Sequence, residues 1–206
     1  MERPFRWAPP AGAPGSVLRA RLLLPLTRRF RVRLVVIEAG AGFGKTTLLA
    51  HAVAENRLRP VGEDAWLSCD TADASESHLL AALLSALGAE PDAAAQPTVD
   101  AVCEAMWAYA PKEVCVVLDD VHRIDPGSSG WKALAALVER APANGHVVLA
   151  GRTLGPLPRH QLLAKRDAIA LSEDELRLQA DEIRAVAVIH GVDPVALDGA
   201  AGWPAL

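Results

Sequence analysis

The segment Val35–His51, VVIEAGAGFGKTTLLAH, constrains the fold of this chain more than any other part of it. A short β-branched run, which we predict to be a buried strand, is followed by a glycine-rich turn, Lys45, two threonines and an apolar helix. Glycines allow a loop to turn tightly and to point its backbone N–H groups at phosphate oxygens. The order of strand, loop and helix therefore predicts a phosphate-binding loop within an α/β domain.

The loop departs from the usual phosphate-loop pattern at its first position, where Ala39 replaces a glycine. This position belongs to the exit of the strand, where a small side chain fits, so we expect the replacement to be tolerated. Positive φ angles and close backbone approach are expected at Gly40, Gly42 and Gly44. The residues predicted to contact the nucleotide are Ala39, Gly40, Ala41, Gly42, Phe43, Gly44, Lys45, Thr46 and Thr47.

Two side chains at the start of the helix have predicted roles in binding phosphate and metal. Lys45 is predicted to reach the β- and γ-phosphates, and the hydroxyl of Thr46 is predicted to ligate Mg²⁺. The positive end of the helix dipole adds to the attraction for phosphate. The predicted cofactors are therefore ATP or ADP and Mg²⁺. The sequence lacks the N-K-x-D stretch that selects guanine. Its absence favours adenine over guanine.

A second motif, EVCVVLDD at Glu113–Asp120, is a predicted buried strand that ends in two aspartates. A carboxylate at the end of such a strand is poorly solvated unless it is paired or lies near a cation. We predict that Asp119 holds Mg²⁺ and that Asp120 polarises the attacking water; a helix cap or a structural acid is the alternative for each. Arg152 ends a later strand at the same sheet edge, where a cation can sense the γ-phosphate. Its alternative is a surface ion pair.

Three further polar residues lie near the same predicted edge. His122 follows the acid pair and could contact the phosphates or the water, and a turn histidine without such a role is an equal alternative. Asp70 and Thr71 end the predicted second strand, so both are candidates for assisting Mg²⁺.

The rest of the chain alternates between predicted strands and helices. The strands are apolar on both faces, which is typical of a parallel sheet covered by helices on each side. The predicted fold is a three-layer α/β P-loop NTPase with a mostly parallel five-stranded sheet. An additional strand is expected between the two motif strands (the ASCE type), and a short helical appendage follows. The predicted strands are 33–39, 64–69, 113–120, 145–152 and 167–171, and helices are expected at 173–190 and 194–201.

The predicted domain organisation has three parts. Residues 1–16 are rich in proline and glycine and are expected to be a flexible leader, 17–171 form the ATPase core, and 172–206 form a C-terminal helical segment. Residues 17–33 hold six arginines and no acid. That cluster is either a phosphate-attracting segment or a solvated helix face.

The composition and charge of the chain indicate which partners and which cellular compartment to expect. A net charge of -4 argues against nucleic acid as the main partner. The sequence has no apolar run near the ~18 residues that a membrane span needs and no secretory signal pattern at its start. Its three cysteines lack metal-site spacing and are expected to be reduced thiols. We therefore expect a cytoplasmic protein that does not bind a membrane.

Seven motifs, taken together, resemble those of a known family. They are VLRARLLLPL, AGAGFGKTTLLAH, AWLSCDTAD, VVLDDVHRI, HVVLAGRTLGPLPRHQLLAKRD, DELRLQADEIRAVA and GWPAL, in this order from about Val17 to Leu206. They resemble the nucleotide-binding module of MalT-like, LuxR-type large regulators, which belong to the STAND class of signalling ATPases. In that family the first loop glycine is often absent, as at Ala39. The resemblance further implies that Arg19 lies near the adenine, that Arg152 is the γ-phosphate sensor and that Pro204 packs near the base.

The same resemblance implies a nucleotide-dependent switch with slow ATP hydrolysis. ADP is expected to hold an off state, and ATP an on state that self-associates or engages sensor and effector domains. The chain shows no DNA-binding helix-turn-helix pattern, so we expect no direct DNA binding by it and regard it as an ATPase module, either alone or as a fragment of a larger regulator. Two alternatives stay open: a P-loop kinase or ATPase acting on a separate substrate, and a module that binds nucleotide without hydrolysing it.

Overall fold

The computed structural model describes residues 6–11, 15–89, 96–157, 159–193 and 202, and within these ranges five parallel strands form one sheet. The strands are β1 (Leu34–Glu38), β2 (Gly62–Ser68), β3 (Glu113–Asp119), β4 (Gly145–Gly151) and β5 (Ala168–Leu171). Their order across the sheet is β2-β3-β4-β1-β5. Because β4 lies between the strands of the two motifs, the predicted inserted strand is confirmed.

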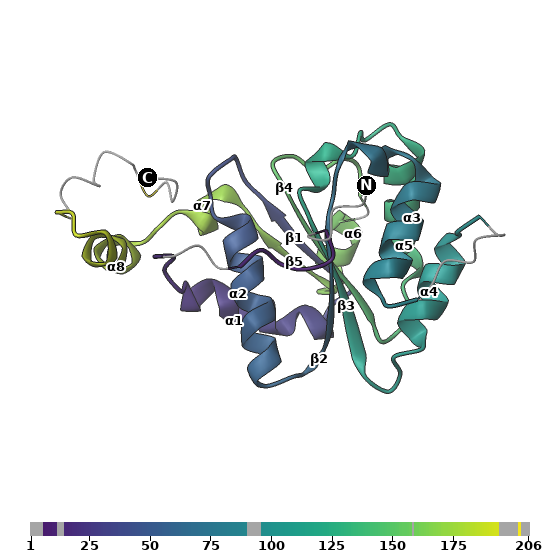
Figure 1. Cartoon of the computed structure of the whole chain (residues 1–206), viewed down its shortest axis with the longest axis horizontal. Helices are drawn as coiled ribbons and strands as arrows, with labels where there is room; N and C mark the ends of the chain where they lie inside the picture. Colours follow the sequence, from purple (N-terminus) through teal and green to yellow (C-terminus); the bar gives the residue numbers. More distant parts are fainter. Residues whose placement is uncertain (1–5, 12–14, 90–95, 158, 194–201, 203–206) are drawn as a thin grey trace.

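Helices cover both faces of this sheet (Figure 1). The α-helices are α1 (Ala20–Thr27), α2 (Lys45–Leu58), α3 (Glu76–Ala86), α4 (Val99–Trp107), α5 (Ser129–Arg140), α6 (Arg159–Ala164), α7 (Glu173–Leu176) and α8 (Ala180–His190). Short 3₁₀ turns are η1 (Arg28–Arg31), η2 (Thr71–Ala74) and η3 (Val121–Arg123). Helices α1 and α2 pack on one face, and α3, α4 and α5 pack on the other (Figure 1).

Alternate residues of each strand supply the two halves of the core. Val116 packs in the cluster that includes Leu79 of α3, whereas the next residue, Val117, packs in the cluster that includes Leu48 of α2. Burying an aliphatic side chain of this size contributes about 1.5–3 kcal/mol. Burial on both faces explains why these strands are continuous apolar runs rather than alternating ones.

The C-terminal segment contains two helices where we predicted one continuous helix over 173–190. Helix α7 ends at Leu176, and α8 begins three residues after Arg177. Each helix has its own capping box, formed by Ser172 with Glu175 and by Gln179 with Glu182. The prediction was wrong because the second capping box starts a new helix at a point where the apolar periodicity continues. The helix expected over 194–201 lies outside the described residues.

The segment that we expected to be a flexible leader is packed at Arg6 and Trp7. The guanidinium of Arg6 donates to both carboxylate oxygens of Asp73, at 2.6 and 2.8 Å. The backbone oxygen of Arg6 accepts from the N–H of Ser68 at 2.8 Å, and the indole of Trp7 donates to the carbonyl of Ala82 at 3.1 Å. These contacts place the start of the described chain across the end of β2.

The arginines of residues 17–33 do not form a solvated face throughout. Arg19 and Arg29 are buried, with 6% and 3% of their surface exposed. Arg29 pairs with Asp64, with Nη2 2.6 Å from Oδ2. For these two residues the solvated-face interpretation was wrong, because both guanidinium groups are buried and donate to backbone carbonyls, and Arg29 also pairs with the buried acid Asp64.

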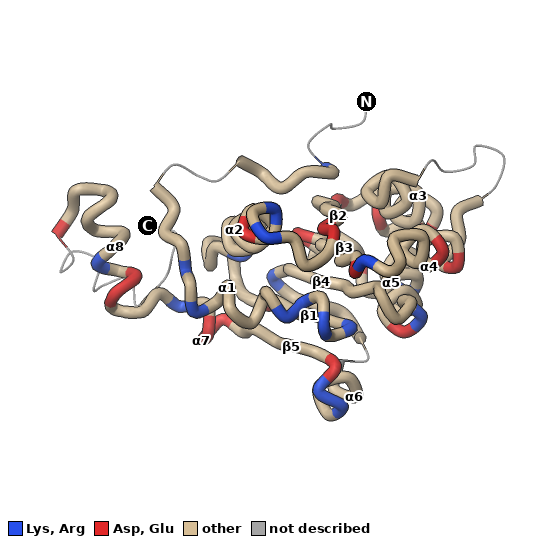
Figure 2. Tube along the Cα trace, turned by 90° about the horizontal axis from the view of Figure 1, so that it is seen from below, with Lys and Arg blue, Asp and Glu red and all other residues tan. Residues whose placement is uncertain are grey.

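Figure 2 shows Lys and Arg positions interspersed with Asp and Glu positions along the described chain. Helix α8 lies at one end of the molecule in both views (Figures 1 and 2) and carries Asp181, Glu182 and Arg184. None of the helices in the described part of the chain has the length and apolar character needed to cross a membrane.

Candidate nucleotide-binding site

The phosphate loop follows β1 directly. The N–H of Ala39 donates to the carbonyl of Gly151 at 3.2 Å, and only 3% of Ala39 is exposed, so this small residue lies at the strand exit as expected. Gly42 and Gly44 have positive φ angles of 78° and 73°. Gly40 does not have a positive φ, so the expectation for that residue was wrong. A Cβ atom there would lie 3.4 Å from Oε2 of Glu173, which is an ordinary contact distance.

Lys45 is the first residue of α2, and its side chain folds back over the phosphate loop. Its ammonium group donates to the carbonyls of Ala39 and Gly40, at 2.8 and 2.7 Å. Burial lowers the pKa of Lys45, while Asp119 and Asp120 act in the opposite direction. The charge of Lys45 is therefore held at the mouth of the loop by groups that phosphate oxygens can replace.

Thr46 and Asp119 meet at the ends of α2 and β3. The hydroxyl of Thr46 donates to Oδ2 of Asp119 at 2.6 Å, and the N–H of Asp120 donates to Oδ1 at 2.9 Å. Asp119 is 3% exposed; burial raises its pKa, and the hydrogen bond from Thr46 opposes that effect. A buried carboxylate beside a hydroxyl is a set of hard oxygen donors that fits Mg²⁺.

Asp120 lies just beyond the strand in the left-handed region, with φ 58° and ψ 30°. Its carboxylate is 38% exposed. Nδ1 of His122 lies 3.8 Å from one of its oxygens, and Nε of Arg123 lies 3.5 Å from the other. Asp120 is thus more accessible than Asp119.

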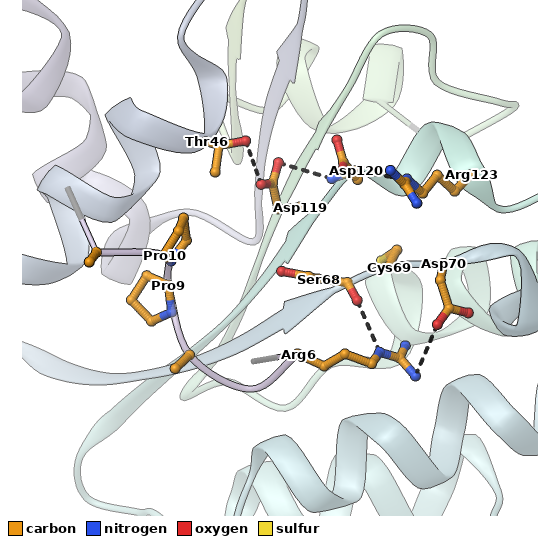
Figure 3. Close-up of a pocket in the computed structure, with 12 residues that line it drawn as sticks. Arg6, Pro9, Pro10, Thr46, Ser68, Cys69, Asp70, Asp119, Asp120 and Arg123 are labelled. Atoms are coloured by element: carbon orange, nitrogen blue, oxygen red, sulfur yellow. Dashed lines mark hydrogen bonds and ion pairs between the residues drawn. The ribbon is translucent and has the colours of Figure 1, made fainter. Parts of the chain in front are cut away.

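A cavity of about 580 Å³ opens beside this acid pair. Thr46, Asp119 and Asp120 line it on one side, and Pro9 and Pro10 of the N-terminal segment lie across from Thr46 and Asp119 (Figure 3). The sequence analysis did not identify this wall, because a proline-rich start resembles a linker. The sequence carries no signal for this wall, because the burial of Asp73, which pairs with Arg6, is a property of the folded chain.

Other predicted residues occupy more distant positions around the loop. Arg152 follows β4, is exposed, and lies close enough to Lys45 and His122 to lower the pKa of both, although burial is the larger cause in each. Thr47 lies in the first turn of α2, and Ala41 is exposed in the loop. Pro204 lies outside the described residues.

Arg19 is buried between the loop and the C-terminal segment. It donates to the carbonyl of Phe43 at 3.3 Å and to the carbonyl of Leu176, and its Nε lies 3.7 Å from Glu182. Its contacts tie the phosphate loop to α7. Nearby, the N–H of Leu178 donates to the carbonyl of Gly202 at 2.7 Å. This contact places Gly202, the first residue of the GWP motif, beside the segment that follows α7.

Asp70 and Thr71 are the two residues predicted as candidates for assisting Mg²⁺. In the structure, Asp70 makes local structural contacts. Its side chain accepts from the N–H of Ala72 at 2.8 Å and lies 3.7 Å from Arg6. Thr71 is exposed in η2. A residue that the sequence analysis missed is Glu173, whose carboxylate accepts from the N–H of Gly40 at 3.2 Å. No motif marks it, because the contact joins residues 133 positions apart.

Comparison with known proteins agrees with this geometry. The family model for an AAA domain matches residues 28–155. The chain is 27% identical over 193 residues to the HTH-type transcriptional regulator MalT of Yersinia enterocolitica, a match that covers 87% of this chain and 21% of that protein. The MalT of Serratia proteamaculans is likewise 27% identical, over 88% of this chain and 21% of its own length. The chain thus spans about a fifth of these curated relatives.

Solved structures share the fold. A Walker-type ATPase of Pyrococcus abyssi superposes with a TM-score of 0.58 at 15% identity, over 98% of this chain and 68% of that one. The Aeropyrum pernix ORC1 protein, solved in complex with DNA, gives a TM-score of 0.54 at 13% identity, over 85% of this chain and 50% of that one. At these identities the similarity concerns the fold alone.

Proposed function

The chain belongs to the AAA domain family, and on that premise we propose that it is a switch module that binds ATP or ADP with Mg²⁺ and hydrolyses ATP slowly. In this proposal the ADP form is the off state and the ATP form is the on state of a MalT-like regulator. The observation that carries the proposal is the contact between Thr46 and Asp119, at 2.6 Å.

That contact joins the phosphate loop to the acid motif across the sheet. β1 and β3 are separated by β4, yet the two predicted metal ligands lie within hydrogen-bond distance. The energetic cost of burying Asp119 makes sense if a cation normally shares its charge. Bound Mg²⁺ would neutralise charge on the β- and γ-phosphates, and Thr46 and Asp119 are the residues that would hold it.

The hydrolysis step uses this chain's own groups. Backbone N–H groups of the loop and the ammonium of Lys45 bind the phosphates and stabilise the charge that develops on them. Asp120 accepts a proton from the water that attacks the γ-phosphorus, while the bond from that phosphorus to the β–γ bridging oxygen breaks to give ADP and phosphate. Arg152 contacts the γ-phosphate and so distinguishes the triphosphate from the diphosphate.

The C-terminal segment can register the state of the loop. Glu173 accepts from Gly40, and Arg19 connects the carbonyls of Phe43 and Leu176. A change in the loop on nucleotide binding therefore acts directly on α7 and, through Glu182, on α8. This connection supports a switch rather than an isolated hydrolase.

Partners and compartment follow from the same proposal. The ATP state self-associates or engages sensor and effector domains, because the named relatives are transcriptional regulators and this chain spans about a fifth of their length. Direct DNA contact is not assigned to this chain, whose net charge is -4. ATP is the cytoplasmic energy carrier, so the proposed site of action is the cytoplasm.

Nucleotide binding is tested by calorimetry with ADP and a slowly hydrolysed ATP analogue, with and without Mg²⁺. Lys45→Ala is expected to weaken binding roughly 10- to 100-fold, since hydrogen bonds to charged groups contribute about 1.5–3 kcal/mol. Lys112→Ala is the matched control, because that lysine is 70% exposed and belongs to another edge of the molecule. Equal affinity of Lys45→Ala and wild type would refute the loop assignment.

Phosphate release separates the proposed switch from its alternatives. Slow release without any added acceptor supports the switch, and Asp120→Asn is expected to abolish it while ADP still binds. Nucleotide binding with no turnover would support the non-hydrolysing module. Native mass spectrometry gives an independent result, because co-purified ADP is expected for a chain held in the off state.

A further inference from the structure

The turn that carries Arg152 is fastened to the end of β1 at two points, one on each side of Arg152. Strands β1 and β4 are neighbours in the sheet, and their register places Glu38 opposite Gly151. The N–H of Ala39 donates to the carbonyl of Gly151 at 3.2 Å, immediately before Arg152. The N–H of Leu154 donates to Oε1 of Glu38 at 3.0 Å, two residues after Arg152. Arg152 therefore lies between two hydrogen bonds that join its turn to the start of the phosphate loop.

The far half of this turn is held by the core of the domain. The side chain of Leu154 is half-buried and packs against the core on the face that α3 and α5 cover. A Cβ atom on Gly155 would lie 2.6 Å from Cε2 of Trp131, and the indole of Trp131 donates to the carbonyl of Pro156 at 2.9 Å. Arg152, by contrast, is exposed. Packing thus anchors the turn beyond Arg152, so loss of the side-chain bond to β1 should free Arg152 while the fold is kept.

An acid at position 38 calls for a physical reason. Glu38 ends the apolar run of β1 and directly precedes the loop that is proposed to bind phosphates. Its negative charge opposes the binding of phosphate groups. A carboxylate, however, accepts a stronger hydrogen bond from a backbone N–H than a neutral oxygen does. The bond to Leu154 supplies the reason, since an apolar residue at position 38 would leave that N–H without this acceptor.

We propose that Glu38 is a positioning residue that sets how well the site distinguishes ATP from ADP: its carboxylate holds the N–H of Leu154 and so places Arg152 at the γ-phosphate. The inference rests on the proposed function, in which Arg152 contacts the γ-phosphate. ADP has no γ-phosphate, so its binding does not depend on where Arg152 lies. Glu38 acts through Arg152 and need not contact the nucleotide. Its effect therefore cannot exceed that of removing Arg152 itself.

The test measures the affinity for ADP and for a slowly hydrolysed ATP analogue, both with Mg²⁺, by calorimetry. Glu38→Ala is expected to lower the affinity for the analogue about three- to ten-fold, the scale of one lost hydrogen bond, while the affinity for ADP stays unchanged. Glu38→Gln keeps an oxygen acceptor without the charge and is expected to lie within about two-fold of wild type. Glu63→Ala is the matched control, because that acid lies near the opposite end of its strand and is 52% exposed.

A shorter acid replaces the alanine variant if Glu38→Ala does not fold. The carboxylate of Glu38→Asp is one methylene short of the N–H of Leu154, so this variant is expected to bind the analogue weakly. The comparison of Asp with Gln then decides whether the hydrogen bond or the charge matters, because Asp keeps the charge and Gln keeps the acceptor at its place.

A double variant shows whether Glu38 works through Arg152. Glu38→Ala combined with Arg152→Ala is expected to bind the analogue no more weakly than Arg152→Ala alone. The inference is overturned if Glu38→Ala binds the analogue as wild type does, if it loses affinity for ADP equally, if Gln behaves as Ala does, or if the two losses add. The proposed function fails separately, when wild type binds neither nucleotide or when Arg152→Ala keeps full affinity for the analogue, and the inference then fails with it.

Discussion

The carboxylate of Glu173 accepts a hydrogen bond from the backbone N–H of Gly40, with 3.2 Å between Oε2 and the nitrogen. The first residue of α7 thus places a negative charge against the loop that is proposed to bind phosphates. Glu173 also acts electrostatically on Lys45, whose pKa it raises against the larger effect of burial. The C-terminal segment and the nucleotide are therefore expected to compete for the same positive region.

Removing this charge is expected to strengthen nucleotide binding. Glu173→Gln should raise the affinity for ADP roughly two- to five-fold at low ionic strength, since it removes the repulsion between a half-exposed carboxylate and the phosphates. The gain should largely disappear in about 0.5 M salt because of screening. Asp174→Asn is the matched control, because that neighbouring carboxylate is 93% exposed. Weaker binding by Glu173→Gln would show instead that the contact holds the loop in its binding shape.

The pair of Arg6 and Asp73 is expected to be essential for stability. Asp73 is fully buried, so Arg6→Met should lower the free energy of unfolding by about 3–5 kcal/mol, the cost of leaving a buried charge without its partner. Urea unfolding measures this difference. The double variant Arg6→Met/Asp73→Asn should recover most of the loss, because Asn keeps the acceptor that Asp73 offers to the N–H of Asp70 but carries no charge. Equal instability of the single and double variants would contradict this account.

Gly130, near the start of α5, is expected to tolerate no side chain. Alanine normally stabilises a helix interior by about 1 kcal/mol relative to glycine. Here, however, a Cβ atom would lie 1.9 Å from the backbone oxygen of Asp73. Gly130→Ala should therefore lower the free energy of unfolding by about 2 kcal/mol or more. Gly127→Ala, where the new atom would make an ordinary contact at 3.5 Å with Asp125, should change it by less than about 0.5 kcal/mol.

Arg19 is expected to contribute to stability through the carbonyls that it holds. Arg19→Ala leaves the carbonyls of Phe43 and Leu176 without this donor and should cost about 2–3 kcal/mol, or roughly 4–12 °C in melting temperature. Glu182 keeps its second partner, Arg21, at 2.9 Å, which limits the loss. The exposed residue Arg28 provides the control, since Arg28→Ala should melt as wild type does. A normal melting temperature for Arg19→Ala would show that these contacts contribute little.

Part of what the sequence analysis missed was present in the sequence. The patterns that begin at Ser172 and Gln179 both have an acid three residues later, which is the signature of a capping box. Apolar periodicity continued through Arg177 and concealed the break. Pro204 and its place near the base remain predictions, because that residue lies outside the described part of the chain.

The sequence by itself determined the sheet and the main residues of the candidate site. A strand that is apolar on both faces, a glycine loop and an acid pair are local patterns, and the carboxyl ends of parallel strands necessarily share one edge. These patterns are sufficient to place Lys45, Thr46, Asp119 and Asp120 together at that edge.

Only the tertiary structure decided what surrounds that site. Arg6 reaches Asp73 across 67 positions, Arg19 reaches Leu176 across 157, and Glu173 reaches Gly40 across 133. Such pairs depend on how helices and loops pack against the sheet, and neither periodicity nor composition encodes the distance between two remote side chains. The burial that makes Arg6 and Arg19 informative exists only after packing has excluded water from them.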